Sequence, residues 1–403
     1  MRLKIIFVDD EENVVHGLKR MLYSMRKEWE MSFVLSGEET LKLLEKEKYD
    51  VIVTDMRMPG MDGATLLKHV QEKYPQVIRI ILSGHSNEEM ALRSTQTAHQ
   101  FLAKPCDSET LKITIEKTLK IRSLVEDEEL VKIVNGIGEL PVMPATYMKL
   151  KDELNHENIS TQKVGQIIAQ DITLSAKVLQ LVNSAFFGLP SRITSPMQAT
   201  SLLGINIIKS LVLYIETYGG VKIPKEAQFY LDTLWEYSFT IGNLSKNIMK
   251  ELGGDKHQVD DAYIAGILHD IGKVVLFQVP DYYEKILTIM GEEELSFIEA
   301  EKKLFKTTHA EVGAYLLGLW GLPEQIVEAV AFHNRPSEAK PLTINPLLCL
   351  SIAKVFAGIF ATATEKELSK IDFTETSLDF EVLNSLNITD KLNDLLMSSK
   401  VKI

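Results

Sequence analysis

The stretch VIVTDMRMPGMDG at residues 51–63 decides the fold of the first part of this 403-residue chain. Apolar and β-branched residues lead into Asp55, and a turn rich in Pro and Gly follows. An amphipathic helical pattern begins after it, over residues 64–74. A buried strand that ends in an acid and is followed by a turn and a helix is typical of a βα unit.

Four further apolar runs repeat this strand-then-helix order on either side of that stretch. The expected strands are residues 3–8, 33–35, 49–54, 77–82 and 100–103, with helical patterns between them. Strands that alternate with helices over about 120 residues favour an α/β, doubly wound, parallel sheet. We therefore predict a five-stranded parallel domain of the flavodoxin-like type.

Polar residues stand where these strands end. Asp9 and Asp10 follow the first strand, Asp55 the third, Ser83 the fourth and Lys104 the fifth. In such sheets ligands bind outside the carboxyl ends of the strands. Three carboxylates at one edge repel one another unless a cation lies between them, and Mg²⁺ prefers oxygen ligands. Acids at such turns are often only helix caps, but five polar groups at matching positions favour an aspartate nucleophile for a phosphoryl group.

The motifs resemble the receiver domains of two-component response regulators over the whole of residues 1–123. They are IIFVDDEE at 5–12, VIVTDMRMPGMDG at 51–63, ILSGHS at 81–86 and FLAKP at 101–105. The resemblance implies phosphorylation of Asp55 by a sensor histidine kinase. It also implies Mg²⁺ held by Asp9, Asp10, Asp55 and the backbone carbonyl of Arg57, phosphoryl contacts from Ser83 and Lys104, and a switch role for Phe101. Many relatives have tyrosine at the position of Phe101, so a hydroxyl is lost here.

The charge, the apolar runs and the cysteines of the chain exclude several classes of protein. The chain has a net charge of −12, and residues 1–123 carry 19 basic and 19 acidic residues, so all of the excess negative charge lies beyond them. An acidic second half without a basic helix argues against DNA binding. No apolar run is long enough for a membrane span. Cys106 and Cys349 have no CxxC partner, so we expect a cytoplasmic protein without disulfides.

Residues 124–134 join the two halves. An apolar pattern runs on from residue 107, a charged stretch follows at residues 126–129, and residues 130–137 are apolar again, without Pro or Gly before residue 136. Two interpretations stay open: a continuous helix that couples the domains stiffly, and a last helix of the first domain with an exposed tail. We place the second domain at residues 135–335 and a C-terminal helical extension of it at residues 336–403.

The second domain is almost wholly helical by its periodicity. Helices are expected at residues 167–183, 199–212, 235–252 and 262–279, among others. The last of these contains His269 and Asp270, while His309 opens a later helix and His333 ends another segment. Three His and one Asp can form a metal site. Neighbouring residues on a helix point about 100° apart, however, so His269 and Asp270 can share a site only where the helix meets it closely.

Several blocks of this half resemble the HDOD domain, an HD-related output domain of all-α fold. They are LPVMPATYMKL, IIAQDITLSAKVLQLVNSAFFG, ITSPMQATSLLG and GILHDIGK. HD enzymes need an earlier His and a final Asp beside the His-Asp pair. This chain has Tyr237 and Lys354 at those places, and Lys repels a metal cation.

Two functions therefore remain for the second domain. The first is a non-catalytic module that binds an unidentified protein partner, in which His269, Asp270, His309 and His333 form a vestigial HD site without a metal. The alternative is a phosphorylation-gated, metal-dependent phosphohydrolase or phosphodiesterase. A single weakly held metal ion without turnover is a third interpretation. We favour the first, with receiver dimerisation or receiver–output docking as the step that phosphorylation changes.

Overall fold

The computed structural model describes residues 2–83, 97–125, 127–136, 144–156, 159–183, 189, 192–205, 208, 225–339, 343–363, 368 and 371–400. These form two compact units. The first is built on Met1–Glu139, and the second holds most of the remaining chain.

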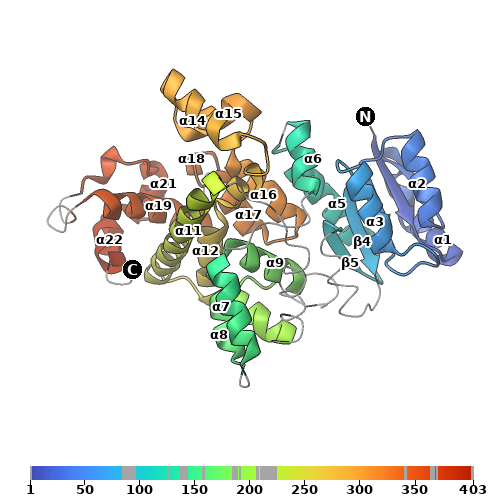
Figure 1. The fold of residues 1–403 in the computed structure, drawn as a ribbon, viewed down its shortest axis with the longest axis horizontal. Coiled ribbons are helices and arrows are strands. Elements are labelled where there is room, and N and C mark those ends of the chain that lie inside the picture. Colours follow the sequence, from blue (N-terminus) through green and yellow to red (C-terminus); the bar gives the residue numbers. More distant parts are fainter. Residues whose placement is uncertain are drawn as a thin grey trace. The chain divides into compact units, whose positions relative to one another are not determined.

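The first unit contains a five-stranded parallel sheet (Figure 1). Its strands are β1 (Leu3–Val8), β2 (Trp29–Val34), β3 (Val51–Thr54), β4 (Ile78–Ser83) and β5 (Gln100–Ala103), in the order β2-β1-β3-β4-β5. This is the doubly wound order with its switch point between β1 and β3. The predicted fold class of this unit is therefore confirmed.

Alternate side chains of each strand enter two different cores. Ile6 and Val8 of β1 lie in one apolar cluster, and Ile5 and Phe7 lie in the other. Because helices cover both faces, the strands are mainly apolar instead of alternating strictly with polar residues. This is why the strand pattern is clear in the sequence.

The helices of this unit are capped by side chains that mark their starts. Asp62 accepts from Thr65 N at the start of α3, and Asp107 accepts from Thr110 N at the start of α5. The helical elements are α1 (Glu12–Met21), η1 (Tyr23–Lys27), α2 (Gly37–Lys46), α3 (Gly63–Lys73), α5 (Ser108–Arg122) and α6 (Glu128–Gly136). Helix α5 ends before α6 begins, so the pattern from residue 107 to 137 forms two helices and not one.

The second unit is helical. Its elements are α7 (Pro144–Asn155), α8 (Thr161–Ile168), α9 (Ile172–Val182), α11 (Lys225–Glu251), α12 (Lys256–Leu268), α13 (Ile271–Leu276), α14 (Tyr282–Glu293), α15 (Phe297–Phe305), α16 (His309–Leu319), α17 (Glu324–Phe332), α18 (Pro336–Ala339), α19 (Pro346–Thr362), η2 (Phe373–Glu375), α21 (Phe380–Ser385), η3 (Thr389–Lys391) and α22 (Leu392–Lys400). Residues 196–205 are also helical. The second half is thus all-α where it is described.

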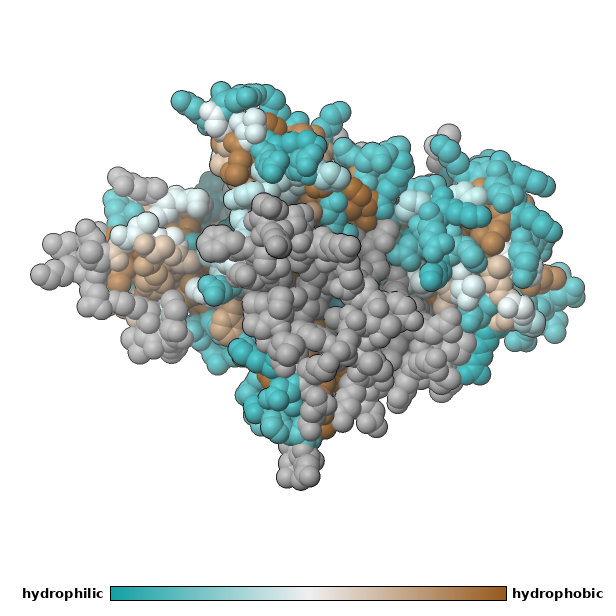
Figure 2. Space-filling view, viewed as in Figure 1, coloured by the Kyte–Doolittle hydropathy of each residue, from teal (hydrophilic) through white to brown (hydrophobic). Residues whose placement is uncertain are grey.

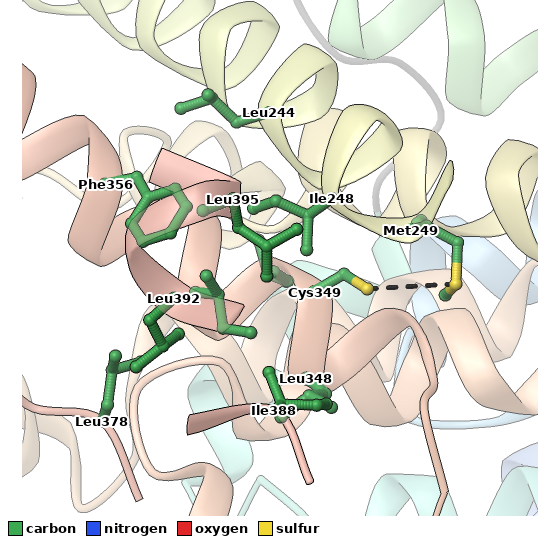
Figure 3. Close-up of a cluster of buried hydrophobic side chains, with 14 of the residues drawn as sticks. Leu244, Ile248, Met249, Leu348, Cys349, Phe356, Leu378, Ile388, Leu392 and Leu395 are labelled. Carbon is green, nitrogen blue, oxygen red and sulfur yellow. Dashed lines mark hydrogen bonds between the residues drawn. The ribbon is translucent and has the colours of Figure 1, made fainter. Parts of the chain in front are cut away.

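The C-terminal segment belongs to the main core of this unit. Helix α11 packs against α12, α19 and α22. Figure 3 shows the cluster where they meet, with Leu392 and Leu395 of α22 among Ile248, Leu348 and Phe356. Helix α22 therefore closes an apolar core that α11, α12 and α19 would otherwise expose.

Two predicted helices are interrupted, and the predictions of single helices there are wrong. The segment 262–279 is divided between α12 and α13, with His269 and Asp270 at the junction. The segment 167–183 is divided between α8 and α9, where Asp171 accepts from Leu174 N and starts a new helix. Side-chain capping competes with helix continuation at such Asp residues. Periodicity does not show these breaks because apolar residues continue through them.

No helix among the described residues is long and apolar enough to cross a bilayer. Figure 2 shows mainly hydrophilic residues on the visible face of α14 and α15, with hydrophobic residues scattered between them. Leu287 on α14 is exposed. Scattered exposed apolar residues are ordinary for a globular surface.

Candidate functional sites

The first site lies at the carboxyl edge of the sheet, where Asp9 and Asp55 meet Lys104. The Lys104 ammonium donates to Asp9 Oδ2 at 2.6 Å and also to Asp55 Oδ1. Asp9 is almost fully buried, and Asp55 is partly buried. Burial lowers the pKa of Lys104, but its hydrogen bonds to Asp55 and Asp9 outweigh burial and raise it. Lys104 therefore stays charged and holds the two carboxylates together.

Backbone contacts fix the orientation of Asp55. Its second oxygen, Oδ2, accepts from Arg57 N at 2.6 Å. Gly63 packs directly on the Asp55 carbonyl, since a Cβ at Gly63 would lie 2.1 Å from that oxygen. Only glycine allows α3 to start this close to the end of β3. The carboxylate is thus held by Lys104 on one side and by the turn on the other.

The other predicted residues of this site are placed as follows. Asp10 is exposed beside Asp9, and Phe101 is partly buried against the core on the α2–α3 side of the sheet. Ser83 ends β4, but its side chain lies outside the described residues. The oxygen-rich donor set and the approach of Asp9 and Asp55 to one ammonium fit a small hard cation such as Mg²⁺.

The second site is a buried His and Asp cluster. Asp270 lies between α12 and α13, His309 begins α16, and His333 follows the last residue of α17. Gly272 brings α13 against α16, because a Cβ there would lie 1.8 Å from the His309 carbonyl. Asp270 Oδ1 is 3.2 Å from His309 Nε2 and 3.5 Å from His333 Nε2, and Asp270 Oδ2 is 3.4 Å from His269 Nε2.

Hydrogen bonds on the far side of each ring set the tautomers of the three histidines. His269 Nδ1 donates to Gly266 O and His333 Nδ1 donates to Val330 O, each at 2.7 Å. His309 Nδ1 donates to Glu301 Oε2 at 2.6 Å. When these rings are neutral, all three Nε2 atoms carry lone pairs that face Asp270. This is how metal-binding histidines are oriented by outer partners.

The centre of the cluster contains unpaired acceptors. His269 Nε2, His333 Nε2 and Asp270 Oδ1 are buried and have no well-aligned hydrogen-bond partner among the described residues. Burial lowers the pKa of His269 to about 4 and holds the pKa of His333 well below its usual value. Lone pairs that face a buried carboxylate are unfavourable unless positive charge lies among them.

Two lysines supply positive charge at this place. Lys273 of α13 donates to Asp270 Oδ2 at 2.7 Å. Lys354 of α19 donates to Asn334 Oδ1 at 2.5 Å, and the Asn334 amide faces His309 Nε2 at 3.2 Å. Burial lowers the pKa of Lys354 to about 8, so it is mostly charged at neutral pH. Its charge in turn helps to lower the pKa of both His269 and His333.

Tyr237 and Glu301 complete the surroundings. The Tyr237 ring on α11 lies 5.8 Å from the His269 ring and is partly exposed. Glu301 on α15 is fully buried, and it accepts from Tyr282 OH as well as from His309. Glu301, Asn334 and Lys273 were not among the site residues expected from the sequence. Lys273 lies within GILHDIGK, whereas the pattern around Glu301 carries no recognisable signal.

The cluster can do one of two things chemically. Asp270, His309 and His333 bring ligand atoms within 4.8 Å of one another, which fits a single ion that prefers nitrogen and oxygen ligands. Alternatively, the ammonium groups of Lys273 and Lys354 supply the positive charge near the Asp270 carboxylate in place of a metal ion. A hydrolytic centre would also need an activated water. Of the residues around the cluster, Tyr237, whose ring lies near that of His269, is partly exposed.

Two family models match successive parts of the chain. Residues 5–116 match the response regulator receiver domain family, and residues 140–336 match the HDOD domain family. The solved structures that resemble this one include the MmoQ response regulator of Methylococcus capsulatus, at 18% identity over 64% of this chain and 98% of that one, with a TM-score of 0.48. An HDOD protein of Geobacter sulfurreducens is 20% identical over 72% of this chain and 97% of that one, with a TM-score of 0.36.

Curated relatives cover parts of the chain. A Treponema pallidum protein of uncharacterised role is 26% identical over 52% of this chain and 41% of its own length. The transcriptional regulator NtrC of Escherichia coli is 31% identical over 31% of this chain and 28% of its own. The chain thus spans well under half the length of these relatives, and what they do as whole proteins is not carried over.

Proposed function

Because the chain belongs to the response regulators that join a receiver domain to an HDOD domain, we propose that a sensor histidine kinase phosphorylates Asp55 and that the HDOD domain then acts on a protein partner without catalysis. The observation that carries the first part is the approach of Asp9, Asp55 and Lys104 at one edge of the sheet. The one that carries the second is the pair of lysines beside Asp270.

In the receiver domain, the Asp55 carboxylate attacks phosphorus, a new P–O bond forms, and the bond to the donor breaks. Asp9, Asp10, Asp55 and the Arg57 carbonyl would hold Mg²⁺, which neutralises phosphoryl charge when bound. Lys104 already bridges Asp9 and Asp55, so its ammonium can pair with the transferred group without a large movement.

Phosphorylation can be tested with acetyl phosphate and Mg²⁺. We expect Asp55→Asn to incorporate no phosphate, as measured by mass spectrometry of the intact chain. Asp107→Asn is a matched control, because Asn caps a helix as well as Asp does and Asp107 lies at the start of α5. Full incorporation in Asp55→Asn would show that the acceptor lies elsewhere.

In the HDOD domain, positive charge that a catalytic metal would supply comes from Lys273 and Lys354. A divalent ion beside two ammonium groups is disfavoured by repulsion. We expect purified protein to contain no stoichiometric transition metal and to hydrolyse neither bis-p-nitrophenyl phosphate nor cyclic nucleotides. Turnover that is lost in His269→Ala would overturn the non-catalytic role and indicate a phosphorylation-gated hydrolase.

A single ion without turnover is the second candidate, and the buried unpaired atoms of Asp270 and His333 favour it. It predicts about one Mn²⁺, Fe²⁺ or Zn²⁺ per chain in protein made with added metal, lost in His309→Ala and His333→Ala. The exposed His257→Ala is the control. Metal below about a tenth of stoichiometry in the wild-type protein would exclude it.

Dimerisation and location complete the proposal. A phosphorylation-dependent homodimer would be seen by light scattering with Mg²⁺ and beryllofluoride and would be absent in Asp55→Asn. We place the protein in the cytoplasm, where a sensor kinase and acetyl phosphate are accessible, and we propose neither DNA binding nor membrane insertion.

A further inference from the structure

Arg79 is the largest fully buried side chain of the first unit. It lies on β4 with its side chain among backbone carbonyl groups. Its guanidinium donates to Thr97 O at 2.5 Å, to Asn135 O at 2.5 Å and to Val77 O at 3.3 Å. A buried charge is tolerated only when hydrogen bonds replace its water. This arginine is therefore held in a built site.

The Asn135 carbonyl belongs to the last turn of α6. Carbonyls in that turn have no partner within their own helix and carry the negative end of the helix dipole. A guanidinium is a favourable cap for such an end. The contact thus joins the C-terminal end of α6, which leads toward the HDOD domain, to the start of β4.

His99 makes a second contact with the same carbonyl. Its Nδ1 accepts from Arg79 N at 3.0 Å, so its Nε2 carries the proton and faces Asn135 O at 3.3 Å. Burial, and next the charge of Arg79, holds the pKa of His99 well below its usual value, which agrees with a neutral ring. A residue of β4 and the residue just before β5 therefore converge on one atom of α6.

We infer that Arg79 and His99 form the receiver's docking site for the end of α6, and that β4 and β5 carry the state of the receiver to the HDOD domain through it. The site lies four residues before Ser83 on β4 and two residues before Phe101 on β5. The second part of this inference rests on the proposed phosphorylation of Asp55. The first part does not, because docking is a property of the unphosphorylated chain.

Hydrogen exchange of the full-length protein tests docking. A free helix of nine residues is marginal in water, so protection of α6 amides requires contacts that hold it. We expect wild-type α6 to be protected, and the amides of its last turn to exchange at least about tenfold faster in Arg79→Met. Arg26→Met is the matched control, because Arg26 also donates to a backbone carbonyl but is exposed.

His99→Leu provides a second variant should loss of Arg79 unfold the receiver, and acetyl phosphate labelling of Asp55 reports whether each variant is folded. Unprotected α6 in wild type, or unchanged exchange in a folded Arg79→Met or His99→Leu protein, would overturn the docking site. Beryllofluoride with Mg²⁺ should alter exchange of the last turn in wild type but not in the variants. If wild-type protein binds beryllofluoride but the exchange of the last turn of α6 does not change, the route through β4 and β5 is overturned. The docking site itself is not overturned by that result.

Discussion

The imidazole of His309 donates its Nδ1 proton to the fully buried carboxylate of Glu301 at 2.6 Å. Glu301 also accepts from the His309 backbone at 3.0 Å and from Tyr282 OH. One side chain of α15 thus satisfies three buried donors and turns His309 Nε2 toward Asp270. The orientation of the cluster depends on a residue that itself touches neither Asp270 nor His333.

Replacing Glu301 should therefore lower the stability of the HDOD domain. We expect Glu301→Ala to lower the free energy of unfolding of the HDOD domain by about 3 kcal/mol or more, because three buried donors lose their acceptor. Hydrogen exchange of the α12 amides measures this change in the free energy of unfolding. Glu293→Ala is the control, since Glu293 forms an exposed ion pair with Lys303 and should cost less than about 1 kcal/mol. Equal losses in both variants would contradict a special role for Glu301.

The stability of the HDOD domain should fall in mild acid. The pKa of His269 is about 4 in the folded protein and 6.5 in the absence of burial. Below pH 6.5 the His269 imidazole of the unfolded chain binds a proton, whereas in the folded chain it does so only below about pH 4. Unfolding is therefore increasingly favoured as the pH falls through that window. The loss from this group is on the order of 3 kcal/mol.

His269→Gln should flatten this dependence, as measured by denaturant unfolding at a series of pH values between 4 and 7. The exposed His257→Gln should leave the slope as it is in wild type. If the two variants behave alike, His269 does not stay neutral in the folded chain. Asp270, whose burial is outweighed by His269 and Lys273 so that its pKa is held well below the usual value, should add a loss only at lower pH.

Lys354 should give a pH dependence of the same sign in a higher pH window. Its pKa is about 8 when folded and 10.5 when unburied, so stability is reduced below pH 8 and recovers as pH rises toward 10.5. We expect Lys354→Met to raise the free energy of unfolding at pH 7 by about 1–3 kcal/mol, with a smaller gain at pH 9.5. A less stable Lys354→Met protein at pH 7 would instead show that the attraction of the ammonium for Asp270 outweighs the cost of its burial.

Gly63 should be needed for phosphorylation as well as for folding. A methyl group at Gly63 would press on the Asp55 carbonyl. We expect Gly63→Ala to slow phosphorylation by acetyl phosphate by about 10²-fold, the usual effect of a misplaced reacting group. Gly17→Ala on α1 is the control, because nothing lies within 4 Å of its added carbon. That change should stabilise the receiver by about 0.5–1 kcal/mol and leave labelling intact.

The sequence alone was sufficient for the sheet and for its acidic edge. Strands buried on both faces are continuous apolar runs, and in a parallel sheet all strand ends meet at one edge. Asp9, Asp55 and Lys104 could therefore be placed together before any coordinates were known. The breaks in the HDOD helices could not be placed, because apolar periodicity continues through His269 and Asp270 while capping ends the helix.

Tertiary structure alone decided the interior of the second site and the docking of α6. Glu301 and Asn334 meet His309 only because α15 and the segment after α17 pack beside it, and their local sequence patterns do not differ from those of surface helices. Arg79 reads in the sequence as one polar residue within a strand. Its guanidinium donates to the carbonyl of Asn135, 56 residues away in the sequence. A hydrogen bond to a distant backbone carbonyl does not depend on the partner's side chain, so the sequence does not reveal it.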